Sequence, residues 1–339
     1  MSRLLSVNDI KVHFPIGKQG ILGRPAGYVK AVDGVSFDIE CGETLGLVGE
    51  SGSGKTTLGR AILRAIHPTS GEILYEQDGN TIDIMSLNRS GLRNIWRNMQ
   101  MIFQDPYASL NPRMTVRDII SEPLLANKLA KGKELNDQVI DMAKLCGLNT
   151  DHLSRFPHAF SGGQRQRIAI ARALILHPNF IVCDEAVSAL DVSIQAQILN
   201  LLKDLQIELN LTYLFIAHDL AAVAYACDRV AVIYLGQVVE IAPTEKLYYS
   251  PQHPYTEALM SAIPDANPAQ VMQPVFLMGE RPSPANPPAG CRFHNRCQYA
   301  TDICRSEMPT LNTILNGHQV ACHHSAQLNL KGALEHGTR

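Results

Sequence analysis

The chain has 339 residues, of which 45% are hydrophobic, enough for one large domain or two smaller ones. Its formal net charge of −2 gives no basis for long-range attraction to nucleic acid or to an anionic membrane. No signal-peptide pattern opens the sequence, and no apolar run approaches the length of a membrane span, so other chains would have to make any membrane crossing.

The first elements in chain order are strands. Residues 4–14 alternate apolar and polar side chains and predict a strand, and residues 17–27 are rich in glycine and predict a loop. A second strand is expected at 35–39. Residues 71–84 resemble a hairpin that belongs to the same sheet.

The stretch Gly49-Glu50-Ser51-Gly52-Ser53-Gly54-Lys55-Thr56-Thr57 fits the pattern Gly-x4-Gly-Lys-[Ser/Thr]. A buried strand is predicted before it at 44–48 and a helix after it at 58–66. Glycines let several backbone N–H groups face one point, and the positive end of the helix dipole favours an anion there. Lys55 would reach the β- and γ-phosphates and Thr56 would ligate Mg²⁺. Chance is the alternative, and the flanking elements argue against it.

Helices dominate from about residue 92 to 160, with 116–125 and 138–145 the clearest. The chain then returns to alternating elements: the pattern predicts helices at 166–176 and 194–209 and strands at 180–183, 213–217 and 229–234. A helical insert within an α/β sheet protein is the resulting architecture.

Polar side chains follow several of these strands. Asp184 and Glu185 end the strand at 180–183, where Asp184 can hold Mg²⁺ and Glu185 can deprotonate a water that attacks a γ-phosphate. Gln104 follows another apolar run and could bind a metal or a water. His218 follows the strand at 213–217, on the edge that parallel strands share. Each residue also has an ordinary reading, as a turn acid, a solvated amide or a structural histidine.

Ser161-Gly162-Gly163-Gln164 opens the helix predicted at 166–176. Ser161 suits an N-cap, and the two glycines leave N–H groups for an anion. A well-capped helix with no ligand is the alternative.

Eight cysteines divide into two groups. Four are scattered through apolar surroundings and are expected in the core. The other four, Cys291, Cys297, Cys304 and Cys322, follow a proline-rich stretch at 264–288 that predicts a stiff connection without a helix. Four thiolates suit either a [4Fe–4S] cluster or tetrahedral Zn²⁺, and unligated thiols are a third possibility. His294, His318, His323 and His324 keep zinc open.

Taken together and in this order, these motifs resemble the ATP-binding subunits of ABC transporters. The matching segments are Gly49–Thr56 (Walker A), Gln104 (Q-loop), Ser161–Gln164 (signature), Ile181–Asp184 with the catalytic Glu185 (Walker B), 188–191 ending in Asp191 (D-loop) and His218 (switch histidine). The resemblance covers residues 4 to about 265. It implies an ATPase with ATP and Mg²⁺ bound by these residues, and adenine stacked on Phe14, with Tyr28 as the alternative.

The resemblance also implies a fold and a domain plan. A P-loop NTPase (RecA-like) α/β core with an antiparallel β subdomain would comprise 1–98 and 161–265, and a helical subdomain 99–160. A Cys-rich C-terminal extension would comprise 266–339. In this family two such domains pair head to tail, so that Ser161 and Gly163 bind the nucleotide held by the partner chain.

Residues 104–113, the stretch His253-Pro254-Tyr255-Thr256 and the stretch 290–297 resemble the dipeptide/oligopeptide importer branch, and the insertion at 17–27 its F-type ATPase. This implies peptide import, a second related ATPase, two transmembrane permease subunits and a periplasmic or extracellular solute-binding protein. It places the chain on the cytoplasmic face of a bacterial inner membrane and implies a [4Fe–4S] cluster on the four clustered cysteines. The competing class, a soluble ABC ATPase of DNA repair or translation, usually carries long coiled coils or two fused ATPase domains, and neither is present here.

Overall fold

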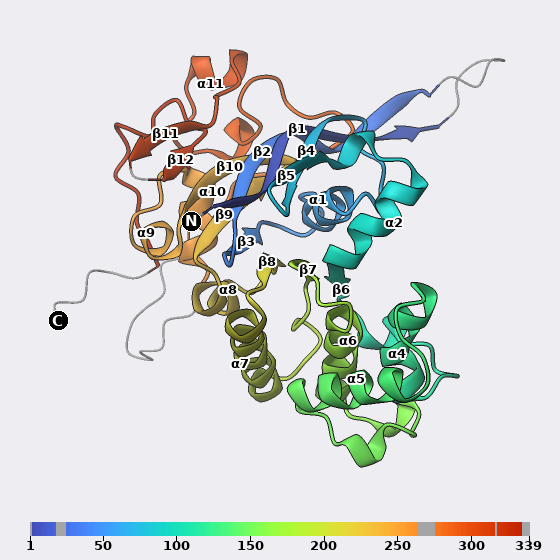
Figure 1. Cartoon of the computed structure of the whole chain (residues 1–339). Coiled ribbons are helices and arrows are strands. Elements are labelled where there is room, and N and C mark those ends of the chain that lie inside the picture. Colours follow the sequence, from blue (N-terminus) through green and yellow to red (C-terminus); the bar gives the residue numbers. More distant parts are fainter. Residues whose placement is uncertain (1, 18–24, 264–274, 316, 334–339) are drawn as a thin grey trace. The chain divides into compact units, whose positions relative to one another are not determined.

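The computed structural model describes residues 2–17, 25–263, 275–315 and 317–333 (Figure 1). The chain forms two compact units. The helical unit comprises Met1–Ser2, Glu40–Thr44 and Ser86–Ala217, and the β-rich unit comprises Arg3–Ile39, Leu45–Met85 and His218–Arg339.

The helical unit is built on three parallel strands in the order β8-β7-β6. They are β6 (Met99–Ile102), β7 (Phe180–Asp184) and β8 (Thr212–Ile216). Every residue of β7 and β8 is buried, as expected for parallel strands that are covered on both faces. The helices are α2 (Arg89–Asn98), α3 (Pro106–Ser109), α4 (Val116–Ala126), α5 (Gly132–Leu145), α6 (Gly162–Leu174) and α7 (Val192–Leu209).

The β-rich unit holds an antiparallel sheet in the order β2-β1-β4-β5. Its strands are β1 (Arg3–Ile16), β2 (Gly27–Glu40), β4 (Ser70–Gln77) and β5 (Asn80–Asp83). The hairpin expected at 71–84 is therefore confirmed, on the sheet where it was expected.

A second run of strands in this unit has the order β11-β12-β10-β9-β3, in which only β3 and β9 are parallel. These strands are β3 (Thr44–Val48), β9 (Arg229–Tyr234), β10 (Gln237–Pro243), β11 (Asn312–Leu315) and β12 (His318–Val320). The helices are α1 (Lys55–Ile62), α8 (Leu220–Ala226), α9 (Thr244–Tyr249), α10 (Pro254–Ser261) and α11 (Asp302–Ser306).

The C-terminal extension, as the structure describes it, comprises 275–315 and 317–333. Its strand β12 pairs with β10, so the extension is joined to the sheet of the β-rich unit by backbone hydrogen bonds. Residues 275–288 form neither helix nor strand, whereas the rest of the predicted proline-rich connection lies outside the described residues. The predicted domain limits at 98/99, 160/161 and 265/266 stay a prediction.

Among the described residues, no helix combines the length and the apolar character needed to cross a bilayer.

Candidate functional site

The loop at 49–57 has the strand–loop–helix arrangement that its sequence predicts, because β3 ends at Val48 and α1 begins at Lys55. Gly49, Gly52 and Gly54 have φ values of 152°, 73° and 109°. A Cβ on Gly49 would lie 2.2 Å from the carbonyl oxygen of Ile233, and one on Gly54 equally close to that of Ala31. No other residue type fits at these two positions, and we call residues 49–57 the phosphate loop.

Polar groups of the phosphate loop converge on its inside. Helix α1 begins after Gly54 without a side-chain hydrogen bond at its N-cap, and the N-terminus of a helix favours an anion. The Lys55 side chain is buried, and its Nζ donates to the carbonyl oxygens of Gly49 at 2.7 Å and Glu50 at 3.1 Å. The buried Ser53 Oγ has no hydrogen-bond partner. A phosphate group would satisfy these donors, and Thr56 and Thr57 follow in the first turn of α1.

Both aromatic residues considered for adenine stacking belong to the β-rich unit and are accessible. Phe14 on β1 is 39% exposed and Tyr28 on β2 is 48% exposed. The exposure of the two rings therefore does not separate them, and the choice of Phe14 stays a prediction.

In the helical unit, β7 ends in the two predicted carboxylates. Asp184 is buried as the last residue of the strand. Glu185 has a φ of 49°, a left-handed conformation that is uncommon for a residue with a side chain. Its N–H donates to the Ile216 carbonyl at the end of β8 at 2.9 Å, and its own carbonyl accepts from Ser188 Oγ at 2.9 Å. Strained backbone of this kind collects at functional sites.

Gln104, predicted to bind a metal or a water, lies beside one of these carboxylates. Its Nε2 donates to Glu185 Oε2 at 2.6 Å. Parallel pairing of β6 with β7 explains the contact, since both residues follow the carboxyl ends of neighbouring strands. A carboxylate and an amide side by side can orient one water molecule.

The stretch 161–164 forms a capping box at the start of α6. Ser161 accepts from the Gln164 N–H, and the Gln164 side chain accepts from the Ser161 N–H at 3.0 Å. The predicted N-cap is confirmed, although the helix begins at Gly162 rather than at Gln166. A Cβ on Gly163 would lie 2.4 Å from Ile194 Cγ2 of α7, so a larger residue there would have to displace the Ile194 side chain.

Two further predicted residues, Asp191 and His218, lie next to the ends of a helix and a strand. Asp191 caps α7 by accepting from the Ile194 N–H at 3.0 Å, which accounts for an aspartate there without a nucleotide. His218 lies two residues beyond the end of β8 and is exposed. The nucleotide roles of both stay predictions.

Two arginines of α6, which belong to none of the sequence motifs, join the segment after Gln104 to this helix. The Arg165 guanidinium lies 3.8 Å from the centre of the Tyr107 ring, a cation–π contact. Arg172 donates to the Ser109 carbonyl at 2.6 Å. Within the helical unit, residues 104–109 are thereby tied to the helix that starts at Ser161. The three arginines of this helix, at 165, 167 and 172, were the available sequence signal.

The four clustered cysteines line one small cavity of about 20 Å³ in the C-terminal extension, together with His294, His323 and His324. Burial raises the pKa of both the Cys291 and the Cys297 thiols to about 11, with the neighbouring cysteines acting in the same direction. Among the described side chains, no three His, Cys, Asp or Glu residues are arranged to hold a single metal ion.

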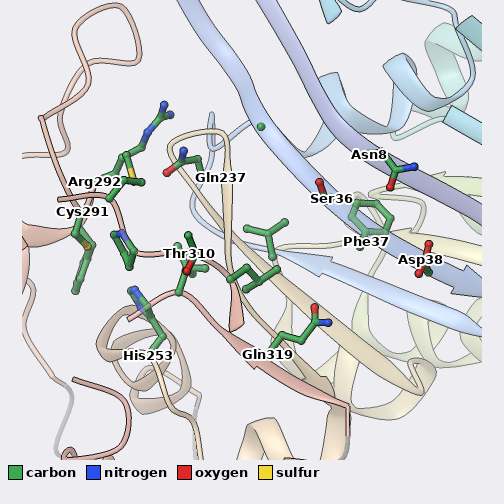
Figure 2. Close-up of a pocket in the computed structure, with 18 of the residues that line it drawn as sticks. Asn8, Ser36, Phe37, Asp38, Gln237, His253, Cys291, Arg292, Thr310 and Gln319 are labelled. Atoms are coloured by element: carbon green, nitrogen blue, oxygen red, sulfur yellow. The ribbon is translucent and has the colours of Figure 1, made fainter. Parts of the chain in front are cut away.

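A larger cavity of about 510 Å³ opens between β2, β10 and the C-terminal extension (Figure 2). Ser36 and Asp38 lie on one wall, and Arg292 and Thr310 on another. Its lining includes none of residues 49–57, so it is separate from the phosphate loop.

Two models of known protein families match different segments of the chain. A family model described as ABC transporter matches residues 32–188, and one described as the C-terminal region of oligopeptide/dipeptide transporters matches 239–304. The oligopeptide transport ATP-binding protein AppF of Bacillus subtilis is 50% identical over 94% of this chain and 97% of its own length. The di/tripeptide transport ATP-binding protein DppF of Pseudomonas aeruginosa is 46% identical over 96% and 99%.

A solved structure agrees with the fold. The ATP-binding cassette MJ0796, in a dimeric post-hydrolysis state with ADP and Pi, superposes with a TM-score of 0.62 at 27% identity. The match covers 71% of this chain and 99% of that one.

Proposed function

Because the chain belongs to the ABC transporter family of ATP-binding proteins, we propose that it hydrolyses ATP to power the import of dipeptides or oligopeptides. The proposed substrate class is supported by how much of the sequence matches a peptide-transport protein. About half of the residues match a peptide-transport ATPase over 94% of the chain, through the phosphate loop and the cysteine-containing extension alike.

In this proposal the phosphate loop, with Lys55, binds the phosphates of ATP. Thr56, Asp184 and Gln104 offer hydroxyl, carboxylate and amide oxygens, the hard ligands that Mg²⁺ prefers. Glu185 is the base that deprotonates the attacking water, and Phe14 stacks on adenine. His218 contacts the γ-phosphate, and hydrolysis removes that group and its contacts.

We further propose a complex with other chains. A second related ATPase would place its nucleotide against Ser161–Gln164 of this chain, and two permease subunits would carry the peptide across the membrane. A solute-binding protein would deliver the peptide from outside, with this chain on the cytoplasmic face. Nucleic acid has no part in it.

The test of the function is reconstitution of the importer in vesicles with its permease and solute-binding subunits. We expect a peptide bound by the solute-binding protein to raise ATP turnover and to accumulate inside only with ATP. If ATP turnover is unchanged by every peptide but rises when DNA or ribosomes are added, the result would instead support the soluble ATPase class.

Substitution of Ser161 tests the shared site. In the assembled complex Ser161→Arg should reduce turnover by about 10²-fold, because the bulky cation displaces donors from the partner's γ-phosphate. The isolated variant should bind ATP normally, since its own phosphate loop is unchanged. Ser90→Arg, on an exposed position of α2, is the matched control. A fully active Ser161→Arg complex would contradict the head-to-tail pairing.

For the cysteine group we propose a [4Fe–4S] cluster on Cys291, Cys297, Cys304 and Cys322. The residues fit this group because the four cysteines face one cavity, and such clusters take four thiolates. The four cysteines include no Cys-x2-Cys pair, which weighs against an ordinary zinc ribbon. A bound cluster would hold the chain segments of the extension together through iron–thiolate bonds.

Anaerobic purification tests the cluster. We expect brown protein with about four iron and four sulfide per chain, and loss of the colour in Cys304→Ser. Cys41→Ser, a half-buried cysteine outside the group, should keep it. Colourless protein with one zinc per chain would contradict the cluster while leaving the ATPase proposal intact.

A further inference from the structure

Two stretches that the ATPase motifs do not include, His253–Thr256 and 290–297, meet in one aromatic cluster of the β-rich unit. The rings of Tyr255 and Phe293 are 5.4 Å apart, and the Tyr234 ring at the end of β9 lies 4.6 Å from Tyr255 and 5.3 Å from Phe293. All three side chains are almost completely buried. The cluster joins α10 and the C-terminal extension to the strand that runs parallel to β3.

This cluster touches the phosphate loop at Glu50. The Glu50 N–H donates to the Tyr255 hydroxyl at 2.8 Å. One guanidinium nitrogen of Arg296 lies 3.0 and 3.1 Å from the two carboxylate oxygens of Glu50, and 3.4 Å from the Tyr234 hydroxyl. The Arg296 side chain is mostly buried, so salt weakens this ion pair less than it would weaken an exposed one.

Another arginine of the C-terminal extension contacts the next residues of the loop. Arg281 donates to the Ser51 carbonyl, and its guanidinium lies 3.2 Å from where a Cβ on Gly52 would be. Residues from outside the loop therefore contact the Glu50 N–H, the Ser51 carbonyl and the Glu50 side chain.

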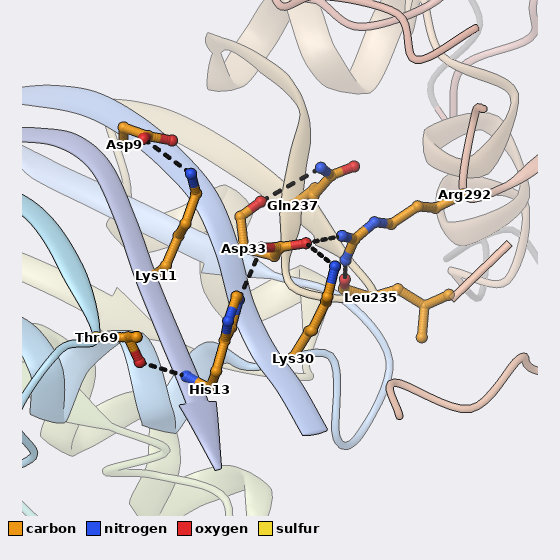
Figure 3. A network of polar contacts seen from close by, with 9 residues as sticks. All are labelled: Asp9, Lys11, His13, Lys30, Asp33, Thr69, Leu235, Gln237 and Arg292. Atoms are coloured by element: carbon orange, nitrogen blue, oxygen red, sulfur yellow. Dashed lines mark hydrogen bonds and ion pairs between the residues drawn. The ribbon is translucent and has the colours of Figure 1, made fainter. Parts of the chain in front are cut away.

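A third arginine supports the other half of the loop. Arg292 donates to the Leu235 carbonyl and to the Asp33 carboxylate, as Figure 3 shows. The neighbouring Gly236 N–H donates to the Ser53 carbonyl at 2.8 Å, and the Asp33 N–H donates to the Gly236 carbonyl at 2.8 Å. The β9–β10 turn between the arginine and the loop is therefore fixed on both sides.

We propose that Arg296, with Tyr255, is a positioning residue for the phosphate loop, so that the C-terminal extension sets the affinity for ATP through Glu50. A glycine-rich loop without these contacts has more conformations to lose on binding, and its affinity falls with the fraction that is competent. This inference rests on the proposed role of residues 49–57 in nucleotide binding.

The experiment titrates full-length Arg296→Gln and Tyr255→Phe with ATP and Mg²⁺. We expect each to weaken ATP binding about tenfold, the size expected for one hydrogen bond to a charged or buried group. KM for ATP should rise while kcat at saturating ATP is kept, because Arg296 does not contact the reacting atoms. Tyr255→Phe retains the aromatic cluster, so it remains informative if Arg296→Gln folds poorly.

Matched controls lie in the same unit. Arg305→Gln removes an exposed arginine of the C-terminal extension, whose guanidinium is 4.0 Å from Asp302. Tyr248→Phe removes a hydroxyl that donates to Leu220, away from the loop. Both should bind ATP as the parent protein does. Equal loss in these controls would assign the effect to general destabilisation and overturn the proposal.

A double-mutant cycle isolates the contact. In a Glu50→Gln background, Arg296→Gln should cost little further affinity for ATP. With Glu50 present, Arg296→Lys should bind ATP more tightly than Arg296→Gln does, because the lysine keeps a positive charge. Unchanged affinity in Arg296→Gln, or an equal loss with and without Glu50, overturns the proposal. Lys55→Ala separates the two levels: if it too binds ATP normally, the phosphate-loop assignment itself is wrong.

Discussion

Glu185→Gln is expected to stop ATP turnover and to leave ATP binding intact. The amide has nearly the shape of the carboxylate but cannot take a proton from the attacking water, and loss of a positioned general base costs about 10²–10⁴-fold in rate. Equilibrium titration should give an ATP affinity within about twofold of the parent, well below the tenfold that corresponds to 1.4 kcal/mol. Single-turnover phosphate release measures the other half of the prediction.

The structure gives a physical reason for assigning the base to Glu185 rather than to Asp184. Asp184 is buried within the strand, whereas the backbone of Glu185 turns out of it in a left-handed conformation. Hydrogen bonds to Ile216 and Ser188 hold that turn, and Gln104 contacts the carboxylate. A strained conformation that is held on both sides indicates a side chain whose direction matters.

A control of equal chemistry is available in the same unit. Glu208→Gln, on the exposed surface of α7, removes the same charge and should turn over ATP normally. If Glu185→Gln kept more than about a tenth of parental turnover, less than the smallest effect of a general base, then another group would have to activate the water.

The parts of the site that the sequence predicted are those with local causes. Residues 49–57 carry their glycines, lysine and flanking strand and helix within one short segment. Gln104 and Glu185 were each predicted to follow an apolar run, but their contact depends on the parallel pairing of β6 with β7, which was not predicted from the sequence. Ser161 signalled its cap through the residue types at 161 and 164.

The contacts that local pattern could not predict join distant segments. Arg296 and Glu50 are 246 residues apart, and nothing around Arg296 distinguishes it from a surface arginine until the aromatic cluster is seen. Gly163 illustrates the same limit, because the side chain that a Cβ at this position would meet is that of Ile194 in another helix, α7. Strand β12 was not predicted, because it pairs with β10, which lies far earlier in the chain.

Lys55 should give the largest effect on binding. Its ammonium is buried at the start of α1, where it bonds the carbonyl oxygens of Gly49 and Glu50. ATP would exchange those neutral acceptors for charged phosphate oxygens. Charge-assisted hydrogen bonds contribute about 1.5–3 kcal/mol, so Lys55→Ala and Lys55→Met should weaken ATP binding by about 10- to 100-fold.

Thermal unfolding separates this effect from misfolding. At 100 times its dissociation constant a ligand stabilises a protein by about 2.7 kcal/mol. At the same ATP concentration a variant with 10- to 100-fold weaker binding gains only about 0.4–1.4 kcal/mol, so ATP should raise its melting temperature by half as much as that of the parent, or less. Without ATP, Lys55→Met should melt close to the parent. The methionine fills most of the space, and the cost of burying an ammonium disappears with the charge.

An exposed lysine provides the control for the two Lys55 variants. Lys246→Ala, on an exposed position of α9, should show the full shift with ATP. If Lys55→Met also showed it, the nucleotide would be bound without the lysine. A lysine buried against two carbonyls would then be a structural feature only, and the assignment of residues 49–57 to phosphate binding would be wrong.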